Sequence, residues 1–333
     1  MTSTDSIQSD FLEQIRSKLP PNLSFVDELA ELLSISRDSA YRRIRGETVL
    51  SLNEIRLLTT RYGISLDDFL SPAKDRVSFQ LKALDVADFS FEKWFKSILD
   101  ALDSFLASPE KDKRMTYDAK DLPIFYYFQF PRLSAFKLYF WIKTFALDTK
   151  LNAGKYDSKM VDNKLITMGE KIWDRYAQIP CTEIITYELL NVTLRQIEYA
   201  YDCGMFNSKE DAQALCDDCS TLANHLQHQA EMGTKLTYGQ PEPGANFKIY
   251  VNEVLIGSNT ILFEMGHKRI AFITPNNFNL LMTTHEAFCQ ITVNHIDNLI
   301  DKSVLITASA QRQRSKFFNR VEETIQIVKS RLN

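Results

Sequence analysis

The chain has 333 residues, of which 44% are hydrophobic and 25% are charged, a composition that is ordinary for a globular protein. Its length exceeds that of most single domains, so two or three domains are expected. With 39 basic and 43 acidic residues the formal net charge is -4, which excludes a chain that is basic throughout. A nucleic-acid interface must therefore rest on a local cluster of basic residues.

The sequence predicts a cytoplasmic protein with no membrane partner. The residues Met1–Gln8 have neither the basic start nor the apolar core of a signal peptide. No apolar run approaches the roughly 18 to 20 residues that a membrane-spanning helix needs. Five cysteines, an odd number spread through the chain, favour reduced thiols over a disulfide framework.

Apolar residues at a helical period predict two helices near the N-terminus. The first covers residues 5–18 and ends before Pro20. The second begins at Ser24, with Asp27 three residues later in a weak form of the capping box. Its apolar stripe, which ends at Leu33, predicts one buried face.

A helix with a basic outer face follows a short turn. The turn covers residues 34–36, and its last serine is a natural N-cap for a helix over residues 37–45. Ala40 and Ile44 are one turn apart and must point inward. At about 100° per residue, Arg42 then points outward. Small helices around a tight turn are one way in which proteins insert a helix into the major groove of DNA.

Two further helices complete the N-terminal pattern. Gly46 ends the basic helix, because glycine is common just past a helix terminus. Ser51 caps a leucine-rich helix that ends near Gly63. Residues 65–70 predict a short fifth helix with carboxylates in its first turn, where the helix dipole favours them.

The order of these segments carries a family resemblance. Leu29-Ala-Glu-Leu-Leu-Ser-Ile-Ser, the helix ending in Arg45-Gly46, the leucine-rich helix and Tyr62-Gly-Ile-Ser-Leu-Asp-Asp-Phe-Leu70 follow one another. Together they resemble the five-helix DNA-binding domain of the lambda-repressor-like (XRE family) helix-turn-helix transcriptional regulators, over roughly residues 8–72. Many relatives have Gln or Thr at the start of the second helix, where this chain has Phe25-Val26. Arg43 stands where an apolar residue is usual.

The resemblance implies which side chains contact DNA. Residues in the first turns of the basic helix are expected to read base edges, and residues beside it to bind phosphates. Arginine suits both roles, since it makes bidentate bonds to guanine and to phosphate. The expected base contacts are Arg37, Asp38, Ser39 and Arg42. The expected phosphate contacts are Ser24, Arg43, Arg45 and Thr48.

The DNA-binding domain is expected to cover residues 1–72, and the remainder of the chain predicts a linker and two further regions. Residues 73–84 are expected to be a linker, and residues 85–238 a helical regulatory domain with helices over 89–107, 157–177, 182–201 and 208–232. Residues 239–333 are expected to form a three-stranded antiparallel β-meander, over 247–251, 260–265 and 268–274, followed by two long helices. The fold class is therefore mainly α, with a small antiparallel sheet.

An aromatic segment from Ile124 to Trp141 has two interpretations. It is either buried core or the lining of a ligand pocket, since pockets are apolar with few polar groups. Pro131 predicts the start of a buried helix within it. The candidate pocket residues are Phe125, Tyr126, Phe136, Tyr139 and Trp141.

The sequence offers little for a metal site or for catalysis. Cys216, Cys219, His225 and His228 are residue types that bind zinc, but on one helix their side chains point in different directions. No phosphate-binding loop, nucleophile elbow or paired-histidine motif occurs. The chain is expected to need no cofactor and to be no enzyme.

These patterns predict a DNA-binding transcriptional regulator. It is expected to bind double-stranded DNA as a homodimer, because one reading helix covers few bases, and to sense a small molecule or peptide through its C-terminal part. The alternative is a protein-interaction module that no longer binds DNA. The acidic residues Asp27, Glu28 and Glu31 on the second helix favour this alternative.

Overall fold

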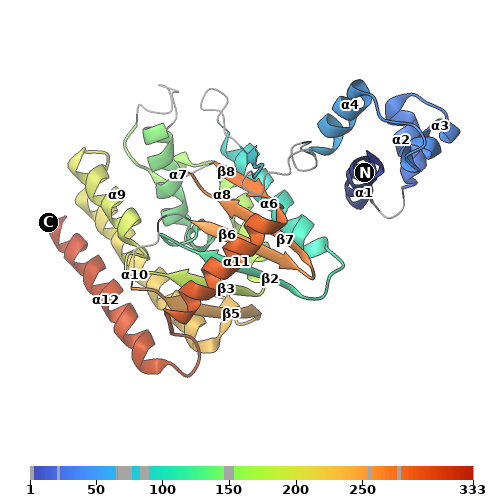
Figure 1. The fold of residues 1–333 in the computed structure, drawn as a ribbon. Helices are drawn as coiled ribbons and strands as arrows, with labels where there is room; N and C mark the ends of the chain where they lie inside the picture. The colour runs from blue at the N-terminus through green and yellow to red at the C-terminus, as the bar shows by residue number, and fades with distance from the viewer. Residues whose placement is uncertain are drawn as a thin grey trace. The chain divides into compact units, whose positions relative to one another are not determined.

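The chain divides into two compact units, unit 1 (Met1–Ser78) and unit 2 (Phe79–Asn333). The structure is a computed structural model, and it describes residues 4–20, 23–64, 66, 77–82, 90–145, 154–253, 257, 259–275 and 279–332. Figure 1 shows the course of the chain. The boundary expected at residues 238 and 239 lies within unit 2.

Unit 1 contains four described helices around one small core. They are α1 (Thr4–Ser17), α2 (Phe25–Leu33), α3 (Arg37–Ile44) and α4 (Leu52–Tyr62). The buried side chains of this core come from all four helices and the residue after α4: Phe11, Leu12, Ile15, Leu29, Leu33, Ala40, Leu58 and Ile64. Of the predicted fifth helix over residues 65–70, only residue 66 is among the described residues, so the structure does not test this helix.

Local capping explains the boundaries of α3 and α4. The hydroxyl of Ser36 accepts from the Ser39 amide at the start of α3, and Ser51 forms a full capping box with Glu54 at the start of α4. Gly46 has a φ of 75°, a left-handed conformation that glycine adopts without strain. The capping box expected at Ser24 is absent, because its side chain makes no cap hydrogen bond.

Nine described strands of unit 2 form a mixed sheet. Its order is β1-β8-β7-β6-β2-β3-β5-β4, with β9 paired to β5. The β2–β3 and β3–β5 pairs are parallel and the others are antiparallel. The strands are β1 (Gln80–Lys82), β2 (Lys113–Asp118), β3 (Cys181–Ile185), β4 (Thr234–Leu236), β5 (Pro243–Val251), β6 (Thr260–Met265), β7 (Lys268–Ile273), β8 (Leu280–Thr283) and β9 (Val304–Leu305).

Helices make up most of the rest of unit 2. They are α6 (Phe91–Ala107), α7 (Pro131–Phe145), α8 (Asn163–Ala177), α9 (Asn191–Asp202), α10 (Lys209–Met232), α11 (Glu286–Asp301) and α12 (Gln311–Arg331), with short 3-10 helices η2 (Ile124–Gln129) and η3 (Ser158–Met160). The predicted start of a helix at Pro131 is confirmed. A mainly helical chain with a sheet is therefore confirmed at this coarse level.

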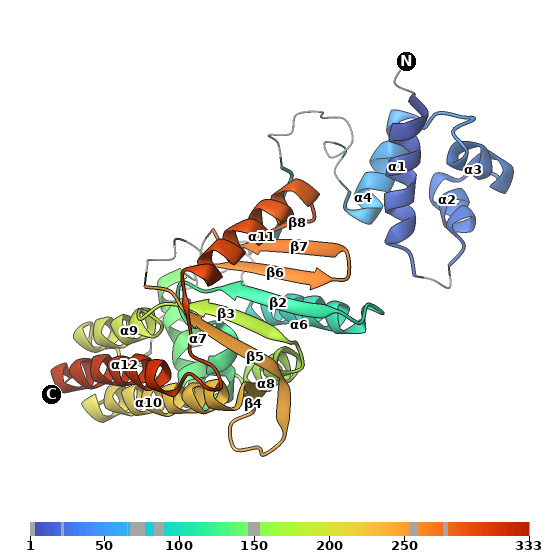
Figure 2. The same ribbon diagram turned by 60° about the horizontal axis from the view of Figure 1, so that its bottom comes forward.

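The sheet lies between two layers of helix. Side chains alternate between the faces of a strand, so Leu262 and Ala271 pack under α11 while Phe263 and Phe272 face the opposite side. Figure 2 shows α11 on one face, with α6, α7 and α8 on the other. Helices α9, α10 and α12 lie side by side in both ribbon views (Figures 1 and 2). The large aromatic core fills the space on the side away from α11.

The predicted three-stranded meander is wrong in one strand. The hairpin of β6 and β7 is confirmed, but the strand that continues it is β8. Strand β5, expected beside β6, instead pairs in parallel with β3, and β2 and β3 separate it from β6. The alternating pattern of residues 247–251 identifies a strand but not its neighbour, because the pairing depends on distant segments.

Three segments of the sheet differ from the expected structure. The charged run of residues 110–114 favours a loop, yet Lys113 and Arg114 begin β2, where Arg114 donates to Glu264 on β6 at 2.6 Å. Residues 182–185 belong to β3, not to a helix. Part of the expected linker, Gln80–Lys82, forms β1 against β8. Within the described residues, no helix is both long and apolar enough to cross a membrane.

Candidate functional site

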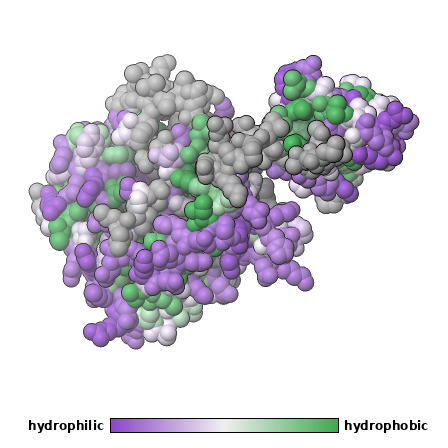
Figure 3. Space-filling view, viewed as in Figure 1, coloured by the Kyte–Doolittle hydropathy of each residue, from purple (hydrophilic) through white to green (hydrophobic). Residues whose placement is uncertain are grey.

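Helix α3 presents a short basic surface, and its opposite face packs on the core of unit 1. Ala40 is fully buried, as predicted, and Ile44 packs partly against the same core. Figure 3 shows hydrophilic residues over the end of unit 1 where α3 lies in Figure 1. Arg42 is exposed, and it has no ion pair within the described part of the chain. Its guanidinium is therefore available to a partner outside the molecule.

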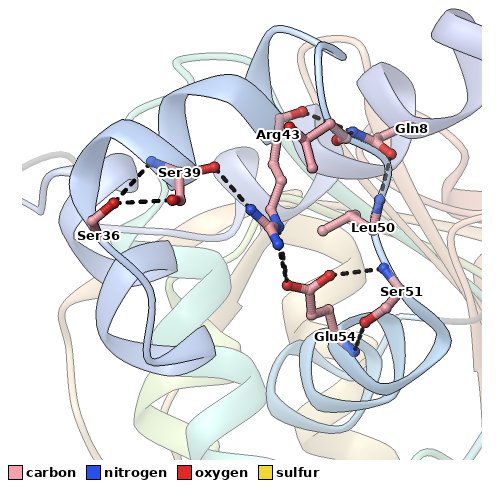
Figure 4. Close-up of polar contacts among 8 residues, drawn as sticks. Gln8, Ser36, Ser39, Arg43, Leu50, Ser51 and Glu54 are labelled. Carbon is pink, nitrogen blue, oxygen red and sulfur yellow. Dashed lines mark hydrogen bonds and ion pairs between the residues drawn. The ribbon is translucent and has the colours of Figure 1, made fainter.

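Arg43, expected to bind a phosphate, is instead part of the packing between α3 and α4. Its Nε and Nη2 lie 2.9 and 2.8 Å from Oε1 of Glu54, and its Nη1 donates to the Ser39 carbonyl at 3.1 Å. The two side chains are only 16% and 15% exposed. Figure 4 shows that the Arg43 side chain points to Glu54 on α4. We therefore assign it a structural role.

Glu54 binds residues of both α3 and the start of α4. Its other carboxylate oxygen accepts from the Ser51 amide at 2.7 Å and closes the capping box of α4. Burial raises the pKa of Glu54, but the hydrogen bonds from Ser51 and Arg43 outweigh burial, and the pKa lies below its ordinary value. The ionised carboxylate thus ties the start of α4 to the middle of α3.

Gln8 of α1 holds the other end of α3. Its amide nitrogen donates to the carbonyls of Arg43 and Thr48 at 2.8 and 2.9 Å, and its amide oxygen accepts from the Leu50 amide at 2.9 Å. These contacts appear beside the Arg43 pair in Figure 4. One side chain therefore satisfies three backbone groups where the chain leaves α3.

The other predicted base contacts differ in their exposure to solvent and in their partners within unit 1. Arg37 pairs with Asp27 of α2 at 2.9 Å, but both side chains are exposed, and exposed pairs contribute only about 0.2–1 kcal/mol. Asp38 is exposed. The hydroxyl of Ser39 accepts from Ser36 at 2.9 Å, which ties it to the N-terminal turn of α3.

Of the other three predicted phosphate contacts, two are exposed to solvent. Ser24 is exposed, and its hydroxyl makes no hydrogen bond to the start of α2. Arg45 pairs with Glu47 at 3.2 Å, again with both side chains exposed. Thr48 is half-buried beside Gln8. Ser24 and Arg45 are therefore the exposed side chains among the four predicted phosphate contacts.

Unit 2 contains a second candidate site, a cavity between α6, α7, α9 and the sheet. Its cavity volume is about 150 Å³. Two of the predicted pocket residues, Phe125 and Trp141, line it. Unpredicted polar residues share the wall, above all Lys137 on α7, Gln196 on α9 and Asp121 before η2.

The other three predicted pocket residues belong to the core. Phe136 is fully buried and stacks on Phe206, with ring centres 5.8 Å apart. The hydroxyl of Tyr139 donates to the Gly154 carbonyl at 3.1 Å. Tyr126 is buried and donates to Glu183 at 2.8 Å. The aromatic segment is therefore core in some positions and cavity wall in others.

A buried polar network lies beside Tyr126. Glu183 is fully buried and accepts from the hydroxyls of Tyr126 and Tyr176. Lys235, also fully buried, donates to the carbonyls of Tyr176 and Ile179 and lies over the Tyr176 ring. Burial raises the pKa of Glu183. None of these side chains lines the cavity, so the network serves packing.

The cysteine and histidine side chains of α10 do not form a cluster. Cys216 and Cys219 are buried, whereas His228 is exposed, and a ring nitrogen of His225 lies 2.8 Å from the Leu236 carbonyl oxygen. Within the described residues, no group of three or more His, Cys, Asp or Glu side chains could hold a metal ion.

Gln8 and Glu54 were not among the residues selected from sequence. The Ser51-Leu-Asn-Glu54 spacing is a capping-box signature and identifies Glu54 as a helix residue. Nothing in the spacing shows that Glu54 meets Arg43 or that Gln8 meets Thr48, because these pairs are 11 and 40 residues apart.

No family model, no curated protein and no solved structure matched the chain.

Proposed function

We propose that the chain is a sequence-specific DNA-binding transcriptional regulator of the lambda-repressor-like (XRE) type, in which α3 enters the major groove. The observation that carries this proposal is that two adjacent arginines, Arg42 and Arg43, are placed differently by the fold. Arg43 is held by Glu54 and fixes α3 against α4, while Arg42 is exposed and has no described ion pair. A rigid helix that presents an unpaired arginine suits bidentate contact with a guanine edge.

Within this proposal the DNA contacts are revised. Arg42 contacts a base edge, and Arg37 and Asp38 are further base contacts at the start of α3. Ser24 and Arg45 bind phosphates. Arg43 and Ser39 position the helix, since their polar groups already bond within unit 1.

The protein acts as a homodimer in this proposal. One short helix contacts too few base pairs for specific binding, so two copies read half-sites about one helical turn apart. Unit 1 is small, and unit 2 carries the dimer contact and the regulatory input. Size-exclusion light scattering of the full chain should give twice its monomer mass of 38.4 kDa. A single monomer species at micromolar concentration would exclude this arrangement.

The alternative of a protein-interaction module rests on the acidic residues of α2, and two of these have partners inside unit 1. Asp27 pairs with Arg37 at 2.9 Å. Glu28 accepts from the Tyr62 hydroxyl at 3.0 Å. Only Glu31 of the three is exposed without a described partner. Two of the three acidic side chains that favour this alternative thus have partners within unit 1.

Fluorescence anisotropy tests the DNA proposal. The full chain is titrated onto a labelled duplex from upstream of its own gene at two salt concentrations, beside Arg42→Ala. A matched control, Arg312→Ala, removes an exposed arginine from α12 in unit 2. Saturable binding should weaken steeply with salt, as counterions are released. Arg42→Ala should cost about 1–3 kcal/mol of binding free energy, and Arg312→Ala should cost none.

Absence of binding to this fragment and to random duplex at low salt would reject DNA binding. Equal losses for Arg42→Ala and Arg312→Ala would reject α3 as the reading element, because they would indicate a nonspecific charge effect.

A further inference from the structure

The cavity of unit 2 contains a buried cation. Lys137 is 5% exposed, and its Nζ donates to Gln196 Oε1 at 2.8 Å and to Thr193 Oγ1 at 3.2 Å. Both acceptors are uncharged, and among the described residues Lys137 forms no ion pair. A buried ammonium group is costly unless an anion pairs with it. Asp121 lines the same cavity, but no described carboxylate forms an ion pair with Lys137, so the ammonium has no direct anionic partner within the described part of the chain.

The amine of Lys137 is suited to carry its charge at neutral pH. Burial lowers the pKa of Lys137 to about 8, while Asp121 and Cys219 act in the opposite direction. At pH 7 most of the amine is thus protonated. An ammonium has three N–H donors, and the two bonds to Thr193 and Gln196 leave one for a ligand.

Aromatic rings hold the ammonium group at the cavity wall. The ring centres of Tyr127 and Trp141 lie 5.0 and 5.3 Å from Nζ, within the range of a cation–π interaction. Both rings line the cavity, and the Tyr127 hydroxyl is itself bonded to Thr193 at 2.6 Å. These contacts keep the amine in place before any ligand arrives, which reduces the entropic cost of binding.

Most of the cavity wall beyond Lys137 is apolar. Side chains of α6, β6 and β7 form this part, and they include Trp94, Ile98, Leu102, Ile261, Phe263 and Phe272. Such a surface favours a hydrocarbon body, aliphatic or aromatic, over a polar one. A ligand with one charged end and an apolar body matches the wall.

The remaining polar residues restrict the charge of that ligand. Asp121 lines the same cavity and accepts from Asn259 Nδ2 at 3.3 Å. The lining contains one lysine and no arginine among the described residues. A phosphate group carries up to two negative charges and is usually held by several cationic or backbone donors. One lysine near a carboxylate suits a single negative charge instead.

We propose that the cavity of unit 2 binds an amphipathic monocarboxylate, whose carboxylate pairs with Lys137 and whose apolar body packs against α6, β6 and β7. The ligand carboxylate supplies the direct ion pair that Lys137 does not make with the described residues. Binding at this site does not depend on DNA. Its use as the regulatory signal rests on the proposed function, and the direct binding measurement below is independent of it.

Tryptophan fluorescence of the full chain measures this binding. Of the three tryptophans, Trp94 and Trp141 line the cavity, while Trp173 donates its indole N–H to Thr237 away from it. Decanoate and 4-phenylbutyrate are the carboxylate probes, and 1-decanol is the neutral probe of matched length. At least one carboxylate should change the fluorescence saturably with one site per chain. Decanol should bind at least about tenfold more weakly than decanoate, because it offers no anion.

Substitutions of two lysines on α7 test the position of the carboxylate. Lys137→Met removes the charge at similar length and should weaken carboxylate binding about tenfold or more, while decanol binding stays within about twofold. Lys143→Met is the matched control, since Lys143 lies on the same helix but does not line the cavity. It should leave binding of every probe within about twofold.

A cavity-filling variant keeps the proposal testable if Lys137→Met does not fold. Ala101 lines the cavity from α6, so Ala101→Phe should remove binding of both decanoate and decanol while Lys137 stays in place. Circular dichroism establishes that each variant is folded. The proposal is overturned if neither carboxylate binds the native chain saturably, if decanoate binds no better than decanol, or if folded Lys137→Met or Ala101→Phe binds decanoate as the native chain does.

Discussion

Replacing Arg43 by methionine should destabilise unit 1, whereas the same change at Arg42 should not. Arg43→Met removes two contacts to Glu54, at 2.9 and 2.8 Å, and one to the Ser39 carbonyl at 3.1 Å. Hydrogen bonds to charged groups contribute about 1.5–3 kcal/mol, and this pair is mostly shielded from water. A loss of about 2 kcal/mol in the opening free energy of α3 and α4 is therefore expected from these bonds. Arg42→Met removes an exposed side chain and should change it by less than about 0.5 kcal/mol.

Hydrogen–deuterium exchange of the full chain measures this difference, because peptides from α3 and α4 report on unit 1 alone. Global unfolding would mix two units and is not a two-state process. Equal protection in native and Arg43→Met chains, or equal losses in both variants, would refute the assignment of a structural role to Arg43.

Three further outcomes follow from the structure. Gln8→Leu leaves the Thr48 carbonyl and the Leu50 amide without their hydrogen-bond partner, while the Arg43 carbonyl keeps its bond from the Gly46 amide. The substitution should cost about 1–3 kcal/mol of protection after α3, measured by the same exchange experiment; unchanged protection would count against its role. Arg45→Ala should weaken DNA binding equally for all sequences and make the salt dependence shallower by about one counterion, measured by anisotropy; a change in sequence preference would instead make Arg45 a base contact. Burial raises the pKa of Asp118 to about 7 from 3.8. The fold therefore favours the protonated form of Asp118, and this preference stabilises unit 2 below about pH 4 and is lost as pH rises to 7. Asp118→Asn should remove this pH dependence of the unfolding free energy, measured by urea unfolding followed by tryptophan fluorescence. An unchanged pH dependence in the variant would contradict the assignment.

Unit 1 could be predicted largely from its sequence, because its signals are local. Ser36 and Ser51 cap the helices that follow them, and Gly46 has the left-handed conformation that its place after α3 implies. Caps and apolar periodicity act over a few residues, which is the distance that a sequence pattern covers. The exposed position of Arg42 followed from the same periodicity.

The sheet of unit 2 could not be predicted in the same way. Strand β3 is buried on both faces, with Ile184 under α11 and Ile185 in the main core, so it lacks the alternation that marks a half-exposed strand. Its run of β-branched residues is the signal that favours a strand over a helix. The neighbours of β5 depend on contacts between segments far apart along the chain, which no local pattern encodes.

The polar partners within the two sites depend on the same long-range contacts. Gln8 reaches Thr48 across 40 residues, and Lys137 reaches Gln196 across 59. Lys137 also lies within an aromatic stretch that predicts core. The four-residue spacing places it beside Trp141 on one face of α7, but only contacts with other elements bring Tyr127 and Gln196 to its amine. The residue types that could line a pocket were evident from sequence, but not which of them face the cavity.

Selection from a pool of random duplexes tests the central claim most directly, because the experiment itself identifies the operator sequence. The full native chain should enrich one sequence, with two half-sites about one helical turn apart if the protein is a dimer. Folded Arg42→Ala should lose preference at one position in each half-site and keep it elsewhere. Failure of the native chain to enrich any sequence, at a salt concentration where it remains folded, would contradict the proposal that α3 reads DNA.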